Sequence, residues 1–236
     1  MNIAEVHTLS GGYGKNTIFR DVSFVLKPGE VLAILGQNGS GKSTLLKTLA
    51  GLLPLQGGQV RLNTLNNAST LQPHRLVEAG ISYCPQAGLV LPDLSIQEHL
   101  LLATRHLGAS DARIAREEGL STFPALNDLL HQRAGTLSGG QSQQLTLAIL
   151  TAQRTNLWLL DEPTAGLAPE LVKATKEFLR QRVQHHHTTM ILVEHDLDVA
   201  LALADRILVL REGTVARMID NVQALEQQLD HEQIYN

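Results

Sequence analysis

The chain has 236 residues, of which 43% are hydrophobic, and a formal net charge of −4, so it can bury one large core. This charge, with no cluster of Lys and Arg among the few aromatic residues, argues against direct binding of nucleic acid. The single cysteine, Cys84, excludes an internal disulfide and fits a reducing compartment. No apolar run reaches the roughly 18 residues of a membrane-spanning helix.

The amino-terminal stretch predicts a small antiparallel sheet. Residues 3–8 and 18–26 alternate apolar and polar side chains, as strands do, on either side of a glycine-rich loop at 10–15. Tyr13 lies on this expected loop, where its ring could stack on a purine base. A lone loop tyrosine is about as often a partly packed surface residue, so both interpretations remain open.

A phosphate-binding motif follows the next strand. The apolar run at 31–35 leads into Gly36-Gln37-Asn38-Gly39-Ser40-Gly41-Lys42-Ser43-Thr44, which has the pattern of a P-loop. Glycines let the backbone close around phosphate, and a helix starting near Lys42 offers free N–H groups and the positive end of its dipole. In such loops the lysine contacts the β- and γ-phosphates, and the Ser43 hydroxyl is a Mg²⁺ ligand. We expect the helix to continue its apolar stripe to Leu53 and to be ended by Pro54 and Gly57-Gly58.

The next buried strand, expected at 80–84, ends at Pro85-Gln86. Sheets of α/β proteins place ligand contacts at such strand ends, so Gln86 is a candidate site residue. From 87 to about 137 the pattern predicts an inserted helical subdomain, with helices near 96–103, 111–118 and 124–131. The apolar residues at 89–91 and 94 are suited to receiving a partner helix, unless they fill the protein's own core.

A second glycine-containing helix start follows the insertion. Leu137-Ser138-Gly139-Gly140-Gln141 opens a helix that we expect to run to about Gln153. Ser138 is a natural cap, and the two glycines allow an anion to approach backbone N–H groups. The segment is therefore a second candidate phosphate site, and the alternative is a plain serine-capped helix.

Carboxylates and a histidine follow the last two core strands. The apolar run at 157–160 delivers Asp161 and Glu162 to the ligand side of the expected sheet. Asp161 would hold Mg²⁺ through water, and Glu162 would orient or deprotonate an attacking water. His195, after a strand at 188–193, is placed to donate a hydrogen bond to the γ-phosphate. The histidines at 185–187 are expected on the surface, and the chain should finish with a hairpin at 207–218 and a short polar helix.

Taken together and in this order, these motifs resemble the full motif set of ATP-binding cassette ATPases. The resemblance implies a single α/β nucleotide-binding domain over residues 1–236, a P-loop NTPase with a mostly parallel core sheet, an N-terminal antiparallel β subdomain and an inserted α-helical subdomain. It implies that Tyr13 stacks on adenine, that Gln86 senses the γ-phosphate and Mg²⁺, and that Ser138 to Gly140 bind the ATP held by a second copy. The expected cofactors are ATP and Mg²⁺.

Within this family, the segments at 73–77, 80–86, 94–98 and 162–169 look like those of the ATPase subunits of branched-chain amino acid and urea importers, and the lipopolysaccharide exporter ATPase is similar too. The resemblance implies ATP hydrolysis coupled to transport through separate transmembrane permease subunits. It also implies a homodimer, or a heterodimer with a related ATPase subunit, in the cytoplasm at the inner face of the cell membrane. Ala168 replaces a frequent aspartate, and Ser142 and Gln144 replace frequent arginines.

Two other classes of protein would explain part of the sequence. A soluble cassette ATPase that works on protein or nucleic acid shares the motifs, but its DNA-repair members insert long coiled coils, which the stretch between Lys42 and Ser138 is too short to hold. A small-molecule kinase or a GTPase would explain the P-loop alone. It would leave the 137–141 segment unexplained, and the chain has no Asn-Lys-x-Asp guanine motif.

Overall fold

The computed structural model describes residues 2–63, 65–66 and 74–222, and the statements below concern these ranges. The polar helix expected in the last fifteen residues lies outside them, except for its first position. None of the helices in the described part of the chain has the length and apolar content needed to cross a membrane.

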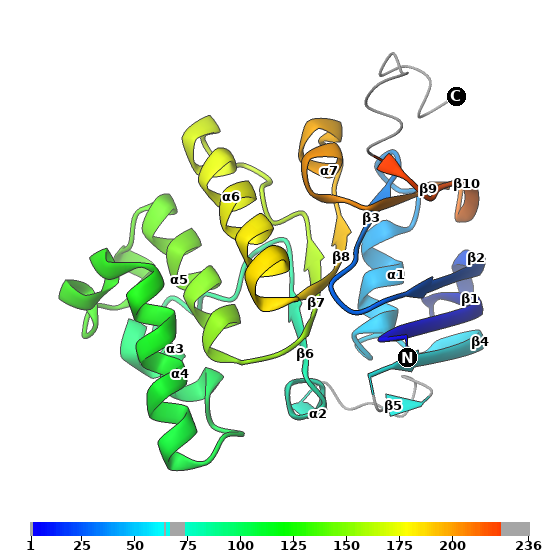
Figure 1. The fold of residues 1–236 in the computed structure, drawn as a ribbon. Coiled ribbons are helices and arrows are strands. Elements are labelled where there is room, and N and C mark those ends of the chain that lie inside the picture. Colours follow the sequence, from blue (N-terminus) through cyan, green and yellow to red (C-terminus); the bar gives the residue numbers. More distant parts are fainter. Residues whose placement is uncertain (1, 64, 67–73, 223–236) are drawn as a thin grey trace.

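Two sheets form the framework (Figure 1). One is antiparallel, in the order β2-β1-β4-β5, and the other has six strands in the order β10-β9-β3-β8-β7-β6. The first contains β1 (Ala4–Tyr13), β2 (Asn16–Leu26), β4 (Leu55–Leu62) and β5 (Leu65–Asn66). The second contains β3 (Val31–Leu35), β6 (Ile81–Cys84), β7 (Leu157–Asp161), β8 (Thr189–Val193), β9 (Arg206–Arg211) and β10 (Thr214–Ile219). Among the pairs formed by these six described strands only β9–β10 is antiparallel, so the predicted mostly parallel core sheet is confirmed.

Strand β7 separates two packed layers. Its residues Leu157 and Leu159 join a cluster with the leucines of α1 (Lys42–Leu49), whereas Trp158 and Leu160 join a cluster with Leu147 of α5 (Gly139–Ala152). Because successive side chains of a strand point to opposite faces, α1 and α5 cover opposite faces of the parallel sheet. The ribbon shows the same arrangement, with β6 and β7 between the two helices (Figure 1).

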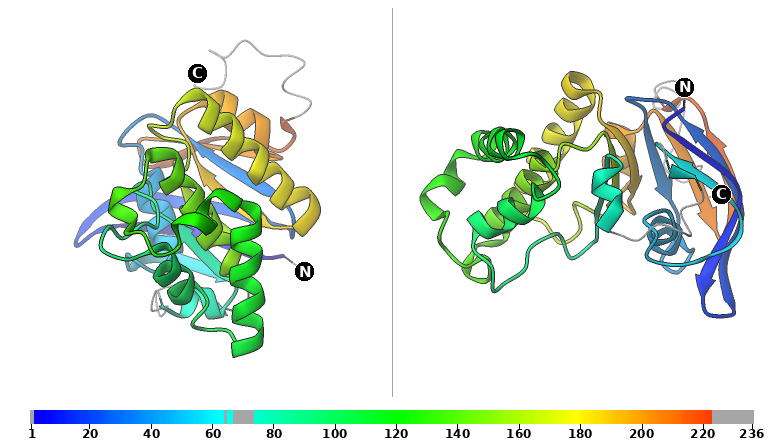
Figure 2. Two further views of the ribbon diagram at one scale, coloured as in Figure 1. Left: turned by 90° about the vertical axis from the view of Figure 1, so that its left-hand side faces the viewer. Right: turned by 90° about the horizontal axis from the view of Figure 1, so that it is seen from below.

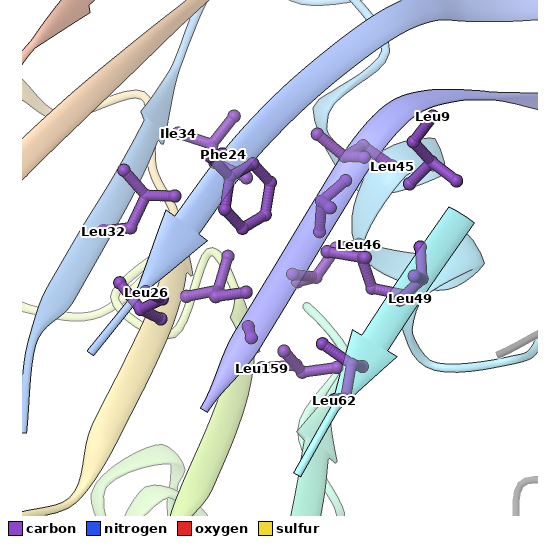
Figure 3. Close-up of a cluster of buried hydrophobic side chains, with 14 of the residues drawn as sticks. Leu9, Phe24, Leu26, Leu32, Ile34, Leu45, Leu46, Leu49, Leu62 and Leu159 are labelled. Atoms are coloured by element: carbon purple, nitrogen blue, oxygen red, sulfur yellow. The ribbon is translucent and has the colours of Figure 1, made fainter. Parts of the chain in front are cut away.

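The antiparallel sheet closes over α1. Figure 3 shows Leu45, Leu46 and Leu49 of this helix packed beside Phe24 of β2 and Leu62 of β4. All five side chains are buried, Phe24 at 4% exposure and the others fully. The helix that begins at the P-loop is thus held between two sheets, which keeps its first turn in a fixed place.

The predicted helical insertion is present. It contains α3 (Ile96–Ala103), α4 (Ala109–Thr122) and the 3₁₀ segments η2 (Pro124–Leu129) and η3 (Ala134–Thr136), gathered at the end of the molecule opposite the antiparallel sheet (Figure 2). Its core includes Leu145 and Ala148 of α5, so the helix that follows residue 138 packs with the insertion. The boundary at about 137 remains a prediction. The other helices are α2 (His74–Glu78), α6 (Pro169–His186) and α7 (Leu197–Leu203).

The prediction of a loop at 10–15 is wrong. β1 continues to Tyr13, which pairs with Asn16 of β2, so only Gly14 and Lys15 form the turn. Gly12 lies inside the strand, where only glycine fits: a Cβ there would lie 2.0 Å from the carbonyl oxygen of Asn16. The glycine therefore marks a close approach of two backbones. In the sequence, a glycine of this kind cannot be told from a loop glycine.

Two helix ends also differ from the prediction. The helix after the P-loop ends at Leu49, because Gly51 adopts a φ of +67°, and the glycines at 57–58 lie inside β4 instead of ending a helix. The segment at 124–131 forms the shorter 3₁₀ segment η2 behind Pro124. At the first place a turn ends the α-helix before the apolar pattern ends, and at the second the chain forms a 3₁₀ segment instead of an α-helix.

Candidate functional site

The P-loop forms a tight turn between β3 and α1. Gly39 and Gly41 have φ values of +80° and +102°, which residues with a Cβ rarely adopt. A Cβ at Gly36 would lie 2.2 Å from the carbonyl oxygen of Leu210. The loop thus needs glycine both for its conformation and for its contact with β9.

Lys42 reaches back across this loop. Its Nζ donates to the carbonyl oxygens of Gly36 at 2.8 Å and Gln37 at 3.1 Å. Burial lowers the pKa of Lys42, while the carboxylates of Glu162 and Asp161 act in the opposite direction. The side chain is 5% exposed, and its nearest compensating charges come from the end of β7.

Ser43 and Asp161 meet where α1 begins and β7 ends. The Ser43 hydroxyl donates to Asp161 Oδ1 at 2.9 Å, and burial raises the pKa of Asp161. A hydroxyl and a carboxylate held side by side are the hard oxygen donors that Mg²⁺ prefers. The two residues therefore fit the predicted metal site.

Glu162, at the end of β7, contacts candidate residues that follow the two strands next to β7. Its Oε2 accepts a hydrogen bond from Gln86 Nε2 at 2.8 Å, after β6, and lies 3.7 Å from His195 Nδ1, after β8. The predicted residues Gln86 and His195 thus both contact the carboxylate of the predicted residue Glu162. Glu162 itself has a φ of +49°, an uncommon conformation for a residue with a Cβ.

The 138–141 segment is built differently. Gln141 N–H donates to Ser138 Oγ at 3.3 Å, and Ser138 N–H donates to Gln141 Oε1 at 2.9 Å, so the two side chains form a capping box. Gly139 and Gly140 supply further first-turn N–H groups, which have no acceptor within the helix. Ser138 and Gly139 are exposed.

This segment does not meet the P-loop within the chain. Of the hydrogen bonds found in the described part of the chain, none joins residues 36–44 to 138–141, and α1 and α5 lie on opposite faces of the sheet. Tyr13 also stands apart at the end of β1, with a side chain that is 50% exposed. Stacking of Tyr13 on adenine stays a prediction.

A groove of about 520 Å³ opens between the core and the insertion, and Leu89, Leu91, Leu102 and Ile149 are among its lining residues. Leu91 is 54% exposed, whereas Leu89 packs against two of the buried clusters. The expected apolar stretch thus divides between core and surface. Buried His99 fixes the exposed part, because its Nε2 accepts the N–H of Leu91 at 2.8 Å.

Sequence reasoning missed Thr164 and Glu194. The Thr164 hydroxyl donates to Glu194 Oε1 at 2.7 Å, and Glu194 is fully buried. A glutamate between an apolar strand and His195 was a visible signal, since an unpaired acidic residue is rarely buried without a reason. In contrast, the histidines at 185–187 are exposed, and the described ranges contain no cluster of three or more His, Cys, Asp or Glu that could hold a metal ion.

Comparisons with known proteins give a consistent result. Residues 19–165 match the family model described as ABC transporter. A probable branched-chain amino acid transport ATP-binding protein, LivF of Archaeoglobus fulgidus, is 35% identical over 208 residues, which cover 88% of each chain. The high-affinity branched-chain amino acid transport ATP-binding protein BraG of Pseudomonas aeruginosa is 34% identical over 203 residues, 86% of each chain.

A solved structure of the ATP-binding subunit of an ABC transporter superposes with a TM-score of 0.81 at 27% identity, covering 96% of this chain and 92% of that one. The family match spans more than half of the chain, and the two relatives above exceed 30% identity over most of it. The chain therefore belongs to the ABC transporter family and is an ATP-binding and ATP-hydrolysing subunit of that family.

Proposed function

We propose that the chain energises the import of amino acids through separate transmembrane permease subunits, at the inner face of the cell membrane. The observation that supports ATP hydrolysis as the energy source is the contact of Gln86 and His195 with the Glu162 carboxylate, next in sequence to Asp161, which accepts a hydrogen bond from Ser43. The names of the LivF and BraG relatives support branched-chain amino acids as the cargo class.

The residues of the P-loop have distinct tasks in this proposal. The backbone N–H groups of residues 36–44 bind the phosphates, and Lys42 exchanges its carbonyl acceptors for the β- and γ-phosphate oxygens. Ser43 and Asp161 would hold Mg²⁺, and we assign Gln86 as a further ligand. When bound, Mg²⁺ offsets negative charge on the phosphates.

The carboxylate of Glu162 orients the attacking water and accepts its proton. Gln86 and His195 contact this carboxylate through Oε2, so both can follow the state of the γ-phosphate. His195 donates to the γ-phosphate, and Gln86 links the site to the groove that begins three residues later.

A second copy, or a related ATPase subunit, completes each ATP site. The exposed first turn of α5 supplies Ser138 and the N–H groups of Gly139 and Gly140 to the ATP bound at the partner's P-loop. Ala168 caps the start of α6, so communication between the copies does not use a carboxylate at this position.

The permease docks at the groove that contains Leu89, Leu91 and Leu102. Its volume of about 520 Å³ and its apolar lining suit one amphipathic helix laid across the surface. Capping of α3 by Ser95 and Glu98 and the His99 contact with Leu91 keep this groove formed.

Replacing Leu91 with Glu tests the docking proposal. We expect L91E to keep basal ATP hydrolysis and to lose copurification with the permease, because a charge replaces the exposed apolar side chain. The matched control is L101E, since Leu101 is an exposed leucine of α3, at 47%, that does not line the groove. Equal permease binding by L91E and L101E would contradict the docking site. Failure of the parent protein to bind any permease would favour a soluble ATPase.

A further inference from the structure

The roles proposed above leave one buried acidic group at the site unused. Glu194 follows β8 and is fully buried. Its Oε1 accepts a hydrogen bond from the Thr164 hydroxyl at 2.7 Å, while its Oε2 is buried without a hydrogen-bond partner. A buried carboxyl group with one oxygen that lacks a hydrogen-bond partner costs folding free energy. Such a residue beside the site is therefore a candidate for a functional role.

The Thr164–Glu194 contact joins the two segments that carry Glu162 and His195. Thr164 lies two residues after Glu162, in the turn closed by the hydrogen bond from Ala165 N–H to Glu162 O at 3.1 Å. Glu194 directly precedes His195. Fixing Thr164 to Glu194 therefore also fixes the separation of the Glu162 carboxylate and the His195 ring, which is 3.7 Å here.

Glu162 needs such support because its backbone is strained. Its φ of +49° brings Cβ close to the following carbonyl oxygen, so the residue relaxes unless its surroundings hold it. One restraint is the hydrogen bond from Glu162 N–H to Val193 O at 2.9 Å. The Thr164–Glu194 bond is a second restraint. It acts two residues after Glu162 in the sequence and also ties the chain to the end of β8.

The carboxyl group of Glu194 suits positioning better than electrostatic catalysis. Burial raises its pKa, and the hydrogen bond from Thr164 and the nearby His195 oppose the rise. The neutral form is thereby favoured relative to a carboxylate in water. Because a carboxyl group accepts the Thr164 hydrogen bond whether or not it is charged, the contact does not depend on a negative charge at Glu194.

We propose that Glu194 and Thr164 are positioning residues that hold Glu162 and His195 in the arrangement required for ATP hydrolysis. This inference rests on the proposed roles of Glu162 and His195. It assigns to the pair an effect on the rate of the chemical step and none on the affinity for ATP, because neither side chain lies among the phosphate-binding residues.

The first test uses T164V, which removes the hydroxyl and keeps the shape. We expect kcat to fall by roughly tenfold or more, since small displacements of catalytic groups have effects of that order, while KM for ATP stays unchanged. T164S should restore kcat because it returns the hydroxyl. T151V is the control, as Thr151 is another buried threonine whose hydroxyl bonds within α5.

The second test examines the partner. We expect E194A to lower kcat as T164V does, and E194Q to recover most of that loss, since its amide oxygen accepts the same hydrogen bond without charge. The double variant T164V/E194A should be no slower than the slower single variant, because both remove one interaction. Should E194A fail to fold, T164V and E194Q still decide the matter.

Three results would overturn the inference. They are an unchanged kcat in T164V, a fall in kcat equalled by T151V, or an E194Q that is as slow as E194A. An E162Q variant keeps this outcome separate from failure of the proposed function: if E162Q hydrolyses ATP at the parent rate, the role of Glu162 is wrong. If E162Q is inactive and T164V is normal, only the positioning inference fails.

Discussion

The P-loop at 36–44 and the segment at 138–141 are both glycine-containing starts of helices, yet the fold treats them in opposite ways. Lys42 is buried, and Ser43 is bonded to Asp161 at the end of β7. Ser138 is exposed, and its side chain bonds within its own capping box. One segment therefore belongs to a site that this chain assembles, while the other offers its donors outward.

The strand between them explains the difference. β7 packs alternate side chains against α1 and against α5, so a helix start on one face cannot turn toward phosphate bound on the other face. A carboxylate at the end of the same strand, Asp161, can reach only the P-loop side. In the proposed function, the two helix starts share one nucleotide when a second subunit brings its own 138–141 segment.

The largest effect should come from the assembled side of this comparison. We expect K42A to lower ATP hydrolysis by about two orders of magnitude or more, because it removes a preorganised charge from the phosphates. The fold should stay intact, since the amine bonds only to two carbonyl oxygens of its own loop. Phosphate release and circular dichroism measure the two quantities. A variant that is both folded and fully active would contradict the site.

A substitution in the exposed 138–141 segment should stop turnover without changing nucleotide binding by one subunit. S138R should bind ATP with the parent affinity and lose turnover, because the bulky side chain blocks contact with ATP on the partner. Mixing S138R with K42A should restore activity, since one composite site then has both an intact P-loop and an intact 138–141 segment. Absence of any recovery in mixed dimers would remove the distinction between the two segments.

A smaller effect should separate the two carboxylates after β7. D161N should weaken Mg²⁺-dependent binding of ATP, since an amide is a poorer ligand for a hard cation than a carboxylate. Binding measured in EDTA should change little, and E162Q should bind Mg-ATP like the parent. Equal loss of metal-dependent affinity in D161N and E162Q would mean that the carboxylates do not have different tasks. Isothermal titration calorimetry gives both affinities.

The smallest effect concerns pH. Burial raises the pKa of Glu194 above its ordinary value of 4.5, so the folded state holds a proton that the unfolded chain releases as pH rises past this value. Folding stability then falls with increasing pH until the raised pKa is passed. E194Q lacks this titration, so its unfolding free energy relative to the parent should increase from about pH 4.5 upward. Urea unfolding at several pH values measures it, and a constant difference would exclude a raised pKa.

Much of the site could be predicted from the sequence because it lies at the ends of short apolar strands. Gln86, Asp161 and His195 each follow such a run, and parallel strands end at one edge of a sheet. The pairing of Thr164 with Glu194 could not be predicted, since it joins residues 30 positions apart that no local period relates. The long β1 was missed because Gly12 serves close backbone contact there, and glycine composition alone indicates a loop.

The central claim, that each ATP site needs two subunits, is tested most directly by the mass of E162Q in solution. Because we propose that Glu162 acts on the attacking water, E162Q should keep ATP bound between the P-loop of one copy and the 138–141 segment of the other. Size-exclusion chromatography with light scattering should then give twice the chain mass of 25.7 kDa with Mg-ATP and the single mass with Mg-ADP. The double variant E162Q/S138R should remain at the single mass in both nucleotides. An E162Q/S138R protein that dimerises with ATP as E162Q does would contradict the account.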